Sequence, residues 1–556
     1  MHATYRVGHR LAPLVGVMLA AHGAVTAVAG QEGRGGSAVP EHASTIELFE
    51  TSDVCLGCHN GVTAATGEDI SIGFDWRATM MANSARDPYW HAAVRREVMD
   101  NPSAGAQIQD ECAACHMPMA RYTAHQAGQL GQVFANLSAD VTSSPWAAAA
   151  MDGVSCSVCH LIANEGVGDP SSFTGRFLID PGTPEGERLI YGPFEVDEGR
   201  ARLMQSASGF RPAQSAHVQS SELCASCHTL YTHPLDEDGN VIGELPEQVP
   251  YLEWQHSDYR ETRSCQSCHM PDVPSPAPVT SVLGQPRDSV SRHVFRGGNF
   301  FMLRMLNRYR VELGVTALPQ ELETAATRTI EHLRTSTARL RVERLERAAG
   351  AASFDVVVEN QAGHKLPTAY PSRRAWLHVV VRDADGTVVF ESGALSPDGS
   401  IVGSDADRDP DAYEPHHLVV RSSEDVQIYE SVMQDADGRP TTALLRGVTY
   451  IKDNRVLPTG FDKATADPDI AVRGGASDDG DFVGGSDRTR YEVAVDGATA
   501  PLTVEVGLWY QPISYRWARN LDDYAHEPEP ARFLRYYDSM ASASGLRIAS
   551  VTARLP

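Results

Sequence analysis

Lysine is nearly missing from this sequence, and positive charge of any kind is scarce. The only lysines among the 556 residues are Lys365, Lys452 and Lys463, so no ring of lysines is available to dock an acidic partner. The formal charge is −25, from 72 acidic and 47 basic residues, which argues against a nucleic-acid partner because such a surface repels phosphate. A protein partner that is steered by charge should therefore be basic, or should recognise an apolar edge.

Long hydrophobic runs are missing after the amino terminus. Arg6 and Arg10 precede an apolar run, Leu11 to Ala21, and a small-residue cleavage point follows at Ala29. This pattern predicts a signal peptide over residues 1–29 and an exported product, either periplasmic or extracellular at the cell surface; an uncleaved signal anchor is the alternative. No other stretch approaches the roughly 20 apolar residues of a transmembrane helix, so we expect no transmembrane segment after signal cleavage.

No cysteine is left over for a disulfide, because all ten lie in one repeated pattern, Cys-x-x-Cys-His. The copies are Cys55, Cys58 and His59; Cys112, Cys115 and His116; Cys156, Cys159 and His160; Cys224, Cys227 and His228; and Cys265, Cys268 and His269. In this pattern two thiols bond the vinyl groups of one porphyrin, and the histidine binds the iron as its proximal ligand. Zinc sites need paired Cys-x-x-Cys units, and a thioredoxin-like motif uses one reactive pair, so neither explains five copies. The pattern therefore predicts five covalently attached haem c groups.

The motifs also predict how the first half of the chain folds. At 42% hydrophobic residues the chain is globular, and its length suggests two or three domains. After a flexible linker over residues 30–49, we expect a pentahaem cytochrome c domain over residues 50–298, in which closely spaced haems replace much of the hydrophobic core. Its fold should be dictated by the cofactors, mostly α and irregular, with short helices such as Tyr89 to Met99.

Whether each iron has a sixth ligand distinguishes two possible functions. An iron with two strong ligands passes electrons, whereas an open iron can bind a substrate. The first choices for distal ligands are His125, His217, His293 and His364, and the candidates for the first haem are Met80, Met81 and His91, with His233 and His256 in reserve. The candidate distal ligands outnumber the five haems, which favours six-coordinate haems that transfer electrons.

Position along the chain ranks these candidates. His125 follows its own motif by nine residues and His217 precedes Cys224 by seven, so each is held near a macrocycle by a short tether. His293 has aromatic and arginine neighbours that suit a porphyrin edge and its propionates. His364 is either a loop histidine or a ligand that joins the two halves of the chain. The methionine pair is either a source of thioether ligands or ordinary core filling.

Several segments resemble those of a known family. They are Cys112 to Pro118 and Cys265 to Pro271, both Cys-x-x-Cys-His-Met-Pro; Tyr251 to Trp254; His293 with Phe295 to Asn299; and Gly363 to Thr368. Over residues 51–383 the chain resembles exported multihaem cytochromes c related to the tetrahaem cytochrome that accepts electrons from hydroxylamine oxidoreductase. The resemblance implies closely stacked haem pairs, mostly bis-histidine ligation and electron transfer. This chain departs from it in having five motifs rather than four and a long β-rich end, so the haem order is not carried over.

The second half of the chain has no haem motif. After its first helices, apolar residues alternate with polar ones at a period of two, as in β-strands. Helices are predicted at Asn299 to Leu313 and from Pro319 to about Thr335, within a helical connector over residues 299–338. Strands are predicted at Phe354 to Val358, Trp376 to Val381, Val388 to Phe390, Gln427 to Tyr429, Thr449 to Lys452, Arg490 to Val495 and Leu502 to Tyr510. They indicate an antiparallel β-sandwich of immunoglobulin-like type over residues 339–556.

Three groups of residues in this half are candidates for binding a metal ion or a haem propionate. The acidic residues Asp405, Asp407, Asp409, Asp411 and Glu414 form either a Ca²⁺ site or a solvated loop. Arg373 and Arg374 either clamp a haem propionate or lie on the surface. His416 and His417 are expected to be exposed rather than to bind a metal. The chain has no nucleophile elbow, phosphate loop or His-Glu-x-x-His motif.

The sequence thus favours an exported pentahaem cytochrome that transfers electrons between redox partner proteins, or to an extracellular acceptor. One alternative is an oxidoreductase acting on a small nitrogen or sulfur compound at one five-coordinate haem. Another is an electron-conducting filament subunit, which would self-associate and donate a histidine, such as His42, His256 or His364, across the interface.

Overall fold

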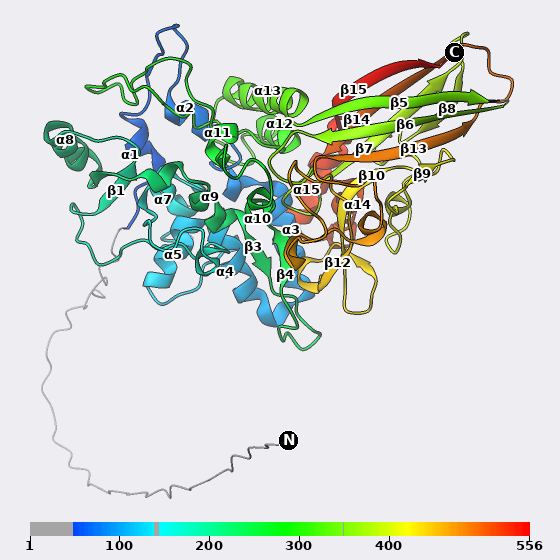
Figure 1. Cartoon of the computed structure of the whole chain (residues 1–556). Helices are drawn as coiled ribbons and strands as arrows, with labels where there is room; N and C mark the ends of the chain where they lie inside the picture. The colour runs from blue at the N-terminus through cyan, green and yellow to red at the C-terminus, as the bar shows by residue number, and fades with distance from the viewer. Residues whose placement is uncertain (1–47, 138–143, 349, 556) are drawn as a thin grey trace, which may run out of the picture. The chain divides into compact units, whose positions relative to one another are not determined.

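The computed structural model describes residues 48–137, 144–348 and 350–555, all within one compact unit, Ile46–Pro556. The predicted signal peptide and nearly all of the predicted linker lie outside the described residues. The chain as far as residue 336 consists of helices, irregular segments and four short strands, and mostly antiparallel strands follow (Figure 1). Within the described part of the chain, no helix is both long and apolar enough to cross a membrane.

The helices are short, and most belong to the first half. They are α1 (Ser52–Leu56), α2 (Ile72–Arg77), α3 (Pro88–Asp100), α4 (Gly105–His116), α5 (Pro118–Gln126), α6 (Ala147–Met151), α7 (Cys156–Leu161), α8 (Glu198–Ser208), α9 (Ser221–His228), α10 (Pro250–Gln255), α11 (Cys265–His269), α12 (Phe300–Arg308), α13 (Pro319–Ser336), α14 (Tyr515–Arg519) and α15 (Pro528–Asp538). The predictions of α3, α12 and α13 are confirmed.

Two small sheets lie in the first half and two larger ones in the second. The strands are β1 (Leu189–Gly192), β2 (Arg211–Gln214), β3 (Leu230–Thr232), β4 (Leu245–Gln248), β5 (Ala338–Ala348), β6 (Ala351–Asn360), β7 (Arg374–Arg382), β8 (Val388–Ser392), β9 (Val419–Val420), β10 (Ile428–Gln434), β11 (Pro440–Thr441), β12 (Thr449–Asp453), β13 (Ser486–Ala494), β14 (Leu502–Gln511) and β15 (Leu546–Leu555). β1 pairs with β2, and β3 pairs with β4.

The two larger sheets share one hydrophobic core. One has seven strands along the path β11-β10-β7-β14-β15, with β12 on β10 and β8 on β7; the other has the order β5-β6-β13-β9, in which β9 is parallel to β13. Val356 of β6, Val379 of β7 and Val504 of β14 belong to the same buried cluster. Two packed sheets are therefore confirmed, and their immunoglobulin-like topology stays a prediction.

The first half has no core of that size. Its buried apolar residues form several small clusters around the motifs, and Cys112, Cys159 and Cys227 pack partly buried against two of them. This arrangement agrees with the expectation that macrocycles replace much of the core between Cys55 and His269.

Contacts between α3 and α15 cross the predicted domain boundary. α3 begins after Asp87, whose side chain accepts hydrogen bonds from the first-turn amides of Tyr89 and Trp90, and Pro88 occupies the first helical position. Arg95 of α3 donates two hydrogen bonds to Glu529 of α15, at 2.8 and 3.0 Å. The carboxy-terminal helix is thus fastened to the region that carries the motifs.

Candidate haem-binding sites

Each Cys-x-x-Cys-His motif forms a helical turn. α11 consists of Cys265–His269, α4 and α9 end at their motif histidines, and α7 begins at Cys156. In the first motif the amide of His59 donates to the carbonyl of Cys55 at 3.0 Å, which continues α1 by one turn. Residues three and four apart share a helix face, so both thiols and the imidazole of a motif lie on one side. All ten thiols are free of disulfides.

The motif histidines are oriented by main-chain carbonyls. The Nδ1 atoms donate to carbonyl oxygens in four of them: His59 to Val279 at 2.8 Å, His116 to Ser84 at 3.0 Å, His160 to Tyr191 at 2.6 Å, and His269 to Arg296 at 2.5 Å. A carbonyl can only accept, so Nδ1 carries the proton and Nε2 keeps its lone pair. This is the tautomer that a metal-ligating histidine needs, with its other nitrogen held by a protein acceptor.

Burial favours the neutral form of four motif imidazoles, those of His116, His160, His228 and His269. It lowers the pKa of His116 and of His269 to about 4, and it lowers the pKa of His160 and of His228 as well. A neutral imidazole is the form that binds iron. The motif histidines are therefore prepared as ligands by burial as well as by hydrogen bonding.

Thiols of different motifs meet although they are far apart in sequence. A hydrogen bond from Cys156 lowers the pKa of the Cys55 thiol, and one from Cys224 lowers the pKa of the Cys265 thiol to about 7. These contacts join the first motif to the third and the fourth to the fifth.

Two further interactions between thiols connect the second motif to the fourth and the third motif to the fourth. The neighbouring Cys115 thiol of the second motif, together with burial, raises the pKa of Cys227 of the fourth, and the Cys159 thiol of the third motif acts electrostatically on Cys224 and Cys227. All five motifs thus belong to one connected cluster. Groups bonded to these thiols would be neighbours.

Two of the predicted distal ligands face a motif histidine. With iron–nitrogen bonds of about 2.0 Å and each ring centre about 1.15 Å behind its nitrogen, two imidazoles on opposite sides of an iron have centroids about 6.3 Å apart. His293 lies 6.3 Å from His160 by ring centroids, with planes 21° apart, and His364 lies 6.3 Å from His269, with planes 14° apart. Their Nδ1 atoms donate to the carbonyls of Ser291 and Lys365, which leaves Nε2 with its lone pair.

Two other predicted ligands have both ring nitrogens occupied by protein groups. His91 Nε2 lies 2.9 Å from the carbonyl of Ala85, and Arg532 donates to its Nδ1 at 2.8 Å. His217 Nε2 lies 2.8 Å from the carbonyl of Ile162, and its Nδ1 is 2.6 Å from Ser215 Oγ. These contacts favour structural roles for His91 and His217.

The other candidates are placed as follows. His125 on α5 has its Nε2 2.6 Å from Asp110, a carboxylate that can only accept, so this nitrogen carries a proton. Met80 packs against the large core of the second half, and Met81 packs against a small cluster near the third motif. Neither methionine is brought beside a motif histidine by a contact in the described part of the chain.

Trp90 is a neighbour of the second motif that the sequence did not indicate. Its ring stacks on His116 with centroids 4.2 Å apart and planes 2° apart. Stacking on the face of the imidazole leaves the edge with Nε2 open and fixes the rotation of the ring. The adjacent aromatic run Tyr89–Trp90 could have suggested such a support, although it does not say which histidine would receive it.

His332 is a second neighbour that sequence reasoning missed. It lies in the last turn of α13, with its ring centroid 6.1 Å from that of His269 and the planes 65° apart. Its Nδ1 is buried without a hydrogen-bond partner among the described residues. The signal in the sequence was its spacing from Glu321 and Arg328, which places all three on one helix face.

The acidic segment after residue 404 does not gather around one point. Asp407 is bound by Arg374 through two hydrogen bonds of 2.7 and 2.8 Å, and Glu414 accepts from the amide of Asp405 at 2.6 Å. Asp409 and Asp411 are exposed. This geometry gives the Ca²⁺ prediction no support. Arg374 is buried on Asp407, so its partner is a carboxylate of its own chain rather than a propionate.

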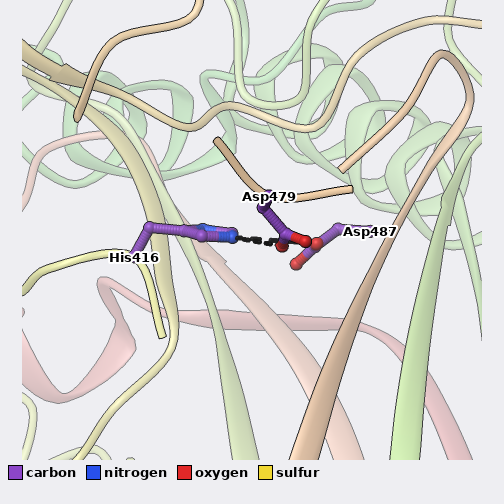
Figure 2. Close-up of side chains that lie close together, drawn as sticks. All are labelled: His416, Asp479 and Asp487. Carbon is purple, nitrogen blue, oxygen red and sulfur yellow. Dashed lines mark hydrogen bonds and ion pairs between the residues drawn. The ribbon is translucent and has the colours of Figure 1, made fainter. Parts of the chain in front are cut away.

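Figure 2 shows the one group of metal-ligand type outside the motifs that occurs among the described residues. His416, Asp479 and Asp487 bring one ligand atom each within 4.8 Å of one another. His416 Nε2 lies 3.0 Å from Asp479 and 3.9 Å from Asp487, and all three side chains are buried. The expectation that His416 is exposed was wrong, because these carboxylates come from a distant segment and cover it.

Hydrogen bonding at His416 favours a proton over a metal ion at this cluster. Gln427 and Asn454 each hold a main-chain amide with their side-chain oxygen, at 2.9 and 3.0 Å, so their NH₂ groups face His416 Nδ1, both at 3.1 Å. Nδ1 therefore accepts, and Nε2 carries the proton that it donates to Asp479. A metal-bound imidazole would need the opposite arrangement. Burial raises the pKa of Asp487.

The donor set at the five motifs fits covalently attached haem. Five pairs of free thiols lie on helical turns, four motif imidazoles carry the ligand tautomer, and two further imidazoles lie at the distance expected across an iron. His332 adds a buried nitrogen without a partner.

The comparisons with known proteins are few. No protein-family model matches the chain, and no curated protein matches it. Among solved structures the chain is similar to a penta-haem cytochrome c552 from Thermochromatium tepidum, with 16% identity and a TM-score of 0.48, over 92% of this chain and 99% of that one. The haem assignment therefore rests on the motif residues and their geometry.

Proposed function

We propose that this chain is an exported pentahaem c-type cytochrome that transfers electrons between redox partners. The observation that carries the proposal is the geometry of the motif histidines, four of which hold Nδ1 on a main-chain carbonyl and keep Nε2 free for a metal. Each bound haem supplies an iron that alternates between the ferric and ferrous states. Haems bound at the five motifs would be neighbours, because thiols of different motifs lie close enough to act on one another electrostatically.

The residues of the chain would hold each haem and orient its ligands. Cys pairs fix each macrocycle, and the carbonyls that hold Nδ1 orient the motif imidazoles. His293 and His364 would supply second imidazoles to irons held by His160 and His269, which would close those two sites to substrates. Two closed positions support electron transfer over substrate chemistry.

An oxidoreductase with one open haem is the second candidate function. It is favoured by His91 and His217, whose ring nitrogens are taken by protein groups and therefore do not close the remaining positions. Among the described residues, ring pairs at a centroid spacing near 6.3 Å are recorded for His160 and His269 and not for His59, His116 or His228, although His91 lies close enough to His116 for an electrostatic interaction.

The filament alternative has less support. His364 lies beside His269 of its own chain, so it is not presented to a neighbouring copy. His256 donates from Nδ1 to the carbonyl of Leu252 at 2.8 Å. His42 lies outside the described residues.

Electron paramagnetic resonance of the oxidised protein, with a CO titration of the reduced protein, tests the proposal. A pure carrier shows only low-spin iron and binds no CO. One high-spin iron that binds one CO per chain would overturn the carrier function in favour of the oxidoreductase. An absence of haem would overturn both.

A further inference from the structure

The inference concerns His332, and it rests on the proposed function. His332 lies on the face of α13 that is turned toward the motif-bearing half. Glu321, Arg328 and His332 are seven and four residues apart, so they form one stripe along the helix. Glu321 accepts a 2.7 Å hydrogen bond from Arg77, and Arg328 donates one of 2.7 Å to Asp75. Both partners lie in α2.

The opposite face of α13 is buried in the core of the second half. Leu322, Ala326 and Leu333 belong to that core. The helix is therefore fixed on both sides, by packing on one face and by ion pairs on the other. This fixation holds the ring of His332 beside that of His269, with its Nδ1 atom buried.

The imidazole of His332 lacks a protein partner. Its Nδ1 is buried and makes no hydrogen bond, and no hydrogen bond to its Nε2 is recorded among the described residues. The titratable groups that act on it are Arg296, His269 and His364, none of which offers an acceptor carboxylate. A buried nitrogen in such surroundings needs a partner that the polypeptide does not provide.

The position of the His332 ring relative to His269 points to a metal ion as the missing partner. Its centroid is 6.1 Å from His269, close to the separation of about 6.3 Å for two imidazoles on opposite sides of one iron. His364 lies at 6.3 Å from the same ring. An iron bound by His269 would have one further axial position, and both His332 and His364 have their ring centroids at the corresponding distance from His269.

We propose that His332 is a second distal ligand for the iron bound by His269, sharing the sixth position with His364. The bond in question is from an imidazole nitrogen to iron, and it involves no change in the electrons of the protein. Either histidine then keeps this iron six-coordinate when the other is lost. The fifth motif would hold the most protected iron of the chain.

The test uses the mature holoprotein and the variants His332→Ala, His364→Ala and the double variant. Low-temperature electron paramagnetic resonance and a CO titration of the reduced protein report the open positions, compared with the wild-type protein. The proposal predicts no additional high-spin iron in either single variant. The double variant should gain one high-spin iron and one CO per chain, and added imidazole should restore the low-spin signal.

Several outcomes overturn the proposal. If His364→Ala alone gains a full CO site, His332 does not ligate the iron. If His332→Ala alone gains one, the position is not shared. A double variant without a new CO site also contradicts it.

Controls keep these outcomes separate from misfolding and from failure of the proposed function. His378→Ala replaces a histidine on β7 that pairs with Glu391 and should change nothing. Haem content must stay the same in every variant. A Cys265→Ser/Cys268→Ser variant must lose one haem; if it does not, the proposed haem at this motif fails rather than the role of His332.

Discussion

Arg455 lies 2.8 Å from Glu253, and both side chains are buried. Glu253 belongs to α10 in the first half, whereas Arg455 follows β12 in the second. Glu253 also accepts from the amide of Lys365, at 3.1 Å, and from the hydroxyl of Thr368, at 2.5 Å. The loop that carries His364 is therefore anchored on one carboxylate.

The change Glu253→Gln should destabilise the protein strongly. It leaves Arg455 buried with less compensating charge and weakens the hold on the loop. Breaking a buried ion pair costs roughly 3–5 kcal/mol of the free energy of unfolding. Denaturant unfolding measures the loss. Glu261→Gln is the matched control, because Glu261 and its partner Arg260 are exposed and the pair is worth about 0–1 kcal/mol. Equal losses in the two variants would contradict the account.

His293 and His91 should behave differently when replaced. His293→Ala removes the imidazole opposite His160 and should give one new high-spin iron that binds CO and is closed again by added imidazole. His91→Gln removes an imidazole whose nitrogens are held by Ala85 and Arg532, so its iron signals should match those of the wild-type protein. A new CO site in His91→Gln would show that His91 is a ligand after all.

Glu247 should make stability depend on pH. Burial raises its pKa from 4.5 to about 7. The folded protein then binds more protons than the unfolded chain between these values, so the contribution of Glu247 to stability is largest near pH 4.5 and falls as the pH rises toward 7. The slope is at most about 1.4 kcal/mol per pH unit.

The variant Glu247→Gln isolates this effect. The amide does not titrate, so the stability of the variant relative to wild type should increase between pH 5 and pH 7. Melting temperatures across that range measure the difference. A constant difference would mean that Glu247 is ionised throughout.

The cluster of His416, Asp479 and Asp487 should hold no metal ion. Elemental analysis of the dialysed protein should find iron and no other metal in stoichiometric amount, and a chelator should leave the melting temperature unchanged. A second metal that disappears in His416→Ala would show that the amides of Gln427 and Asn454 do not set the tautomer of His416.

Local patterns in the sequence predicted much of the fold. α3, α12 and α13 follow from apolar spacing and from proline at the first turn, and β7 and β14 follow from dense apolar runs. β15 was missed because a bulge near Ala549 interrupts its alternation, so that its apolar residues are Leu546 and Ile548 on one parity and Val551 and Leu555 on the other.

Residues of the haem sites were predictable from the sequence only where they belong to a single Cys-x-x-Cys-His motif. The motif fixes two thiols and one histidine, whereas the partners come from other segments: Arg532 reaches His91 from α15, and Ile162 reaches His217 from the third motif. The position of His332 depends on which face α13 turns toward α2, and that is decided by Arg77 and Asp75.

The intact mass of the mature protein under denaturing conditions tests the central claim most directly. Thioether bonds survive denaturation, so the account predicts the polypeptide mass plus five haems, and one haem fewer for each motif whose cysteines are changed to serine. A mature protein that carries fewer than five haems, or that loses none on such a change, would contradict the account.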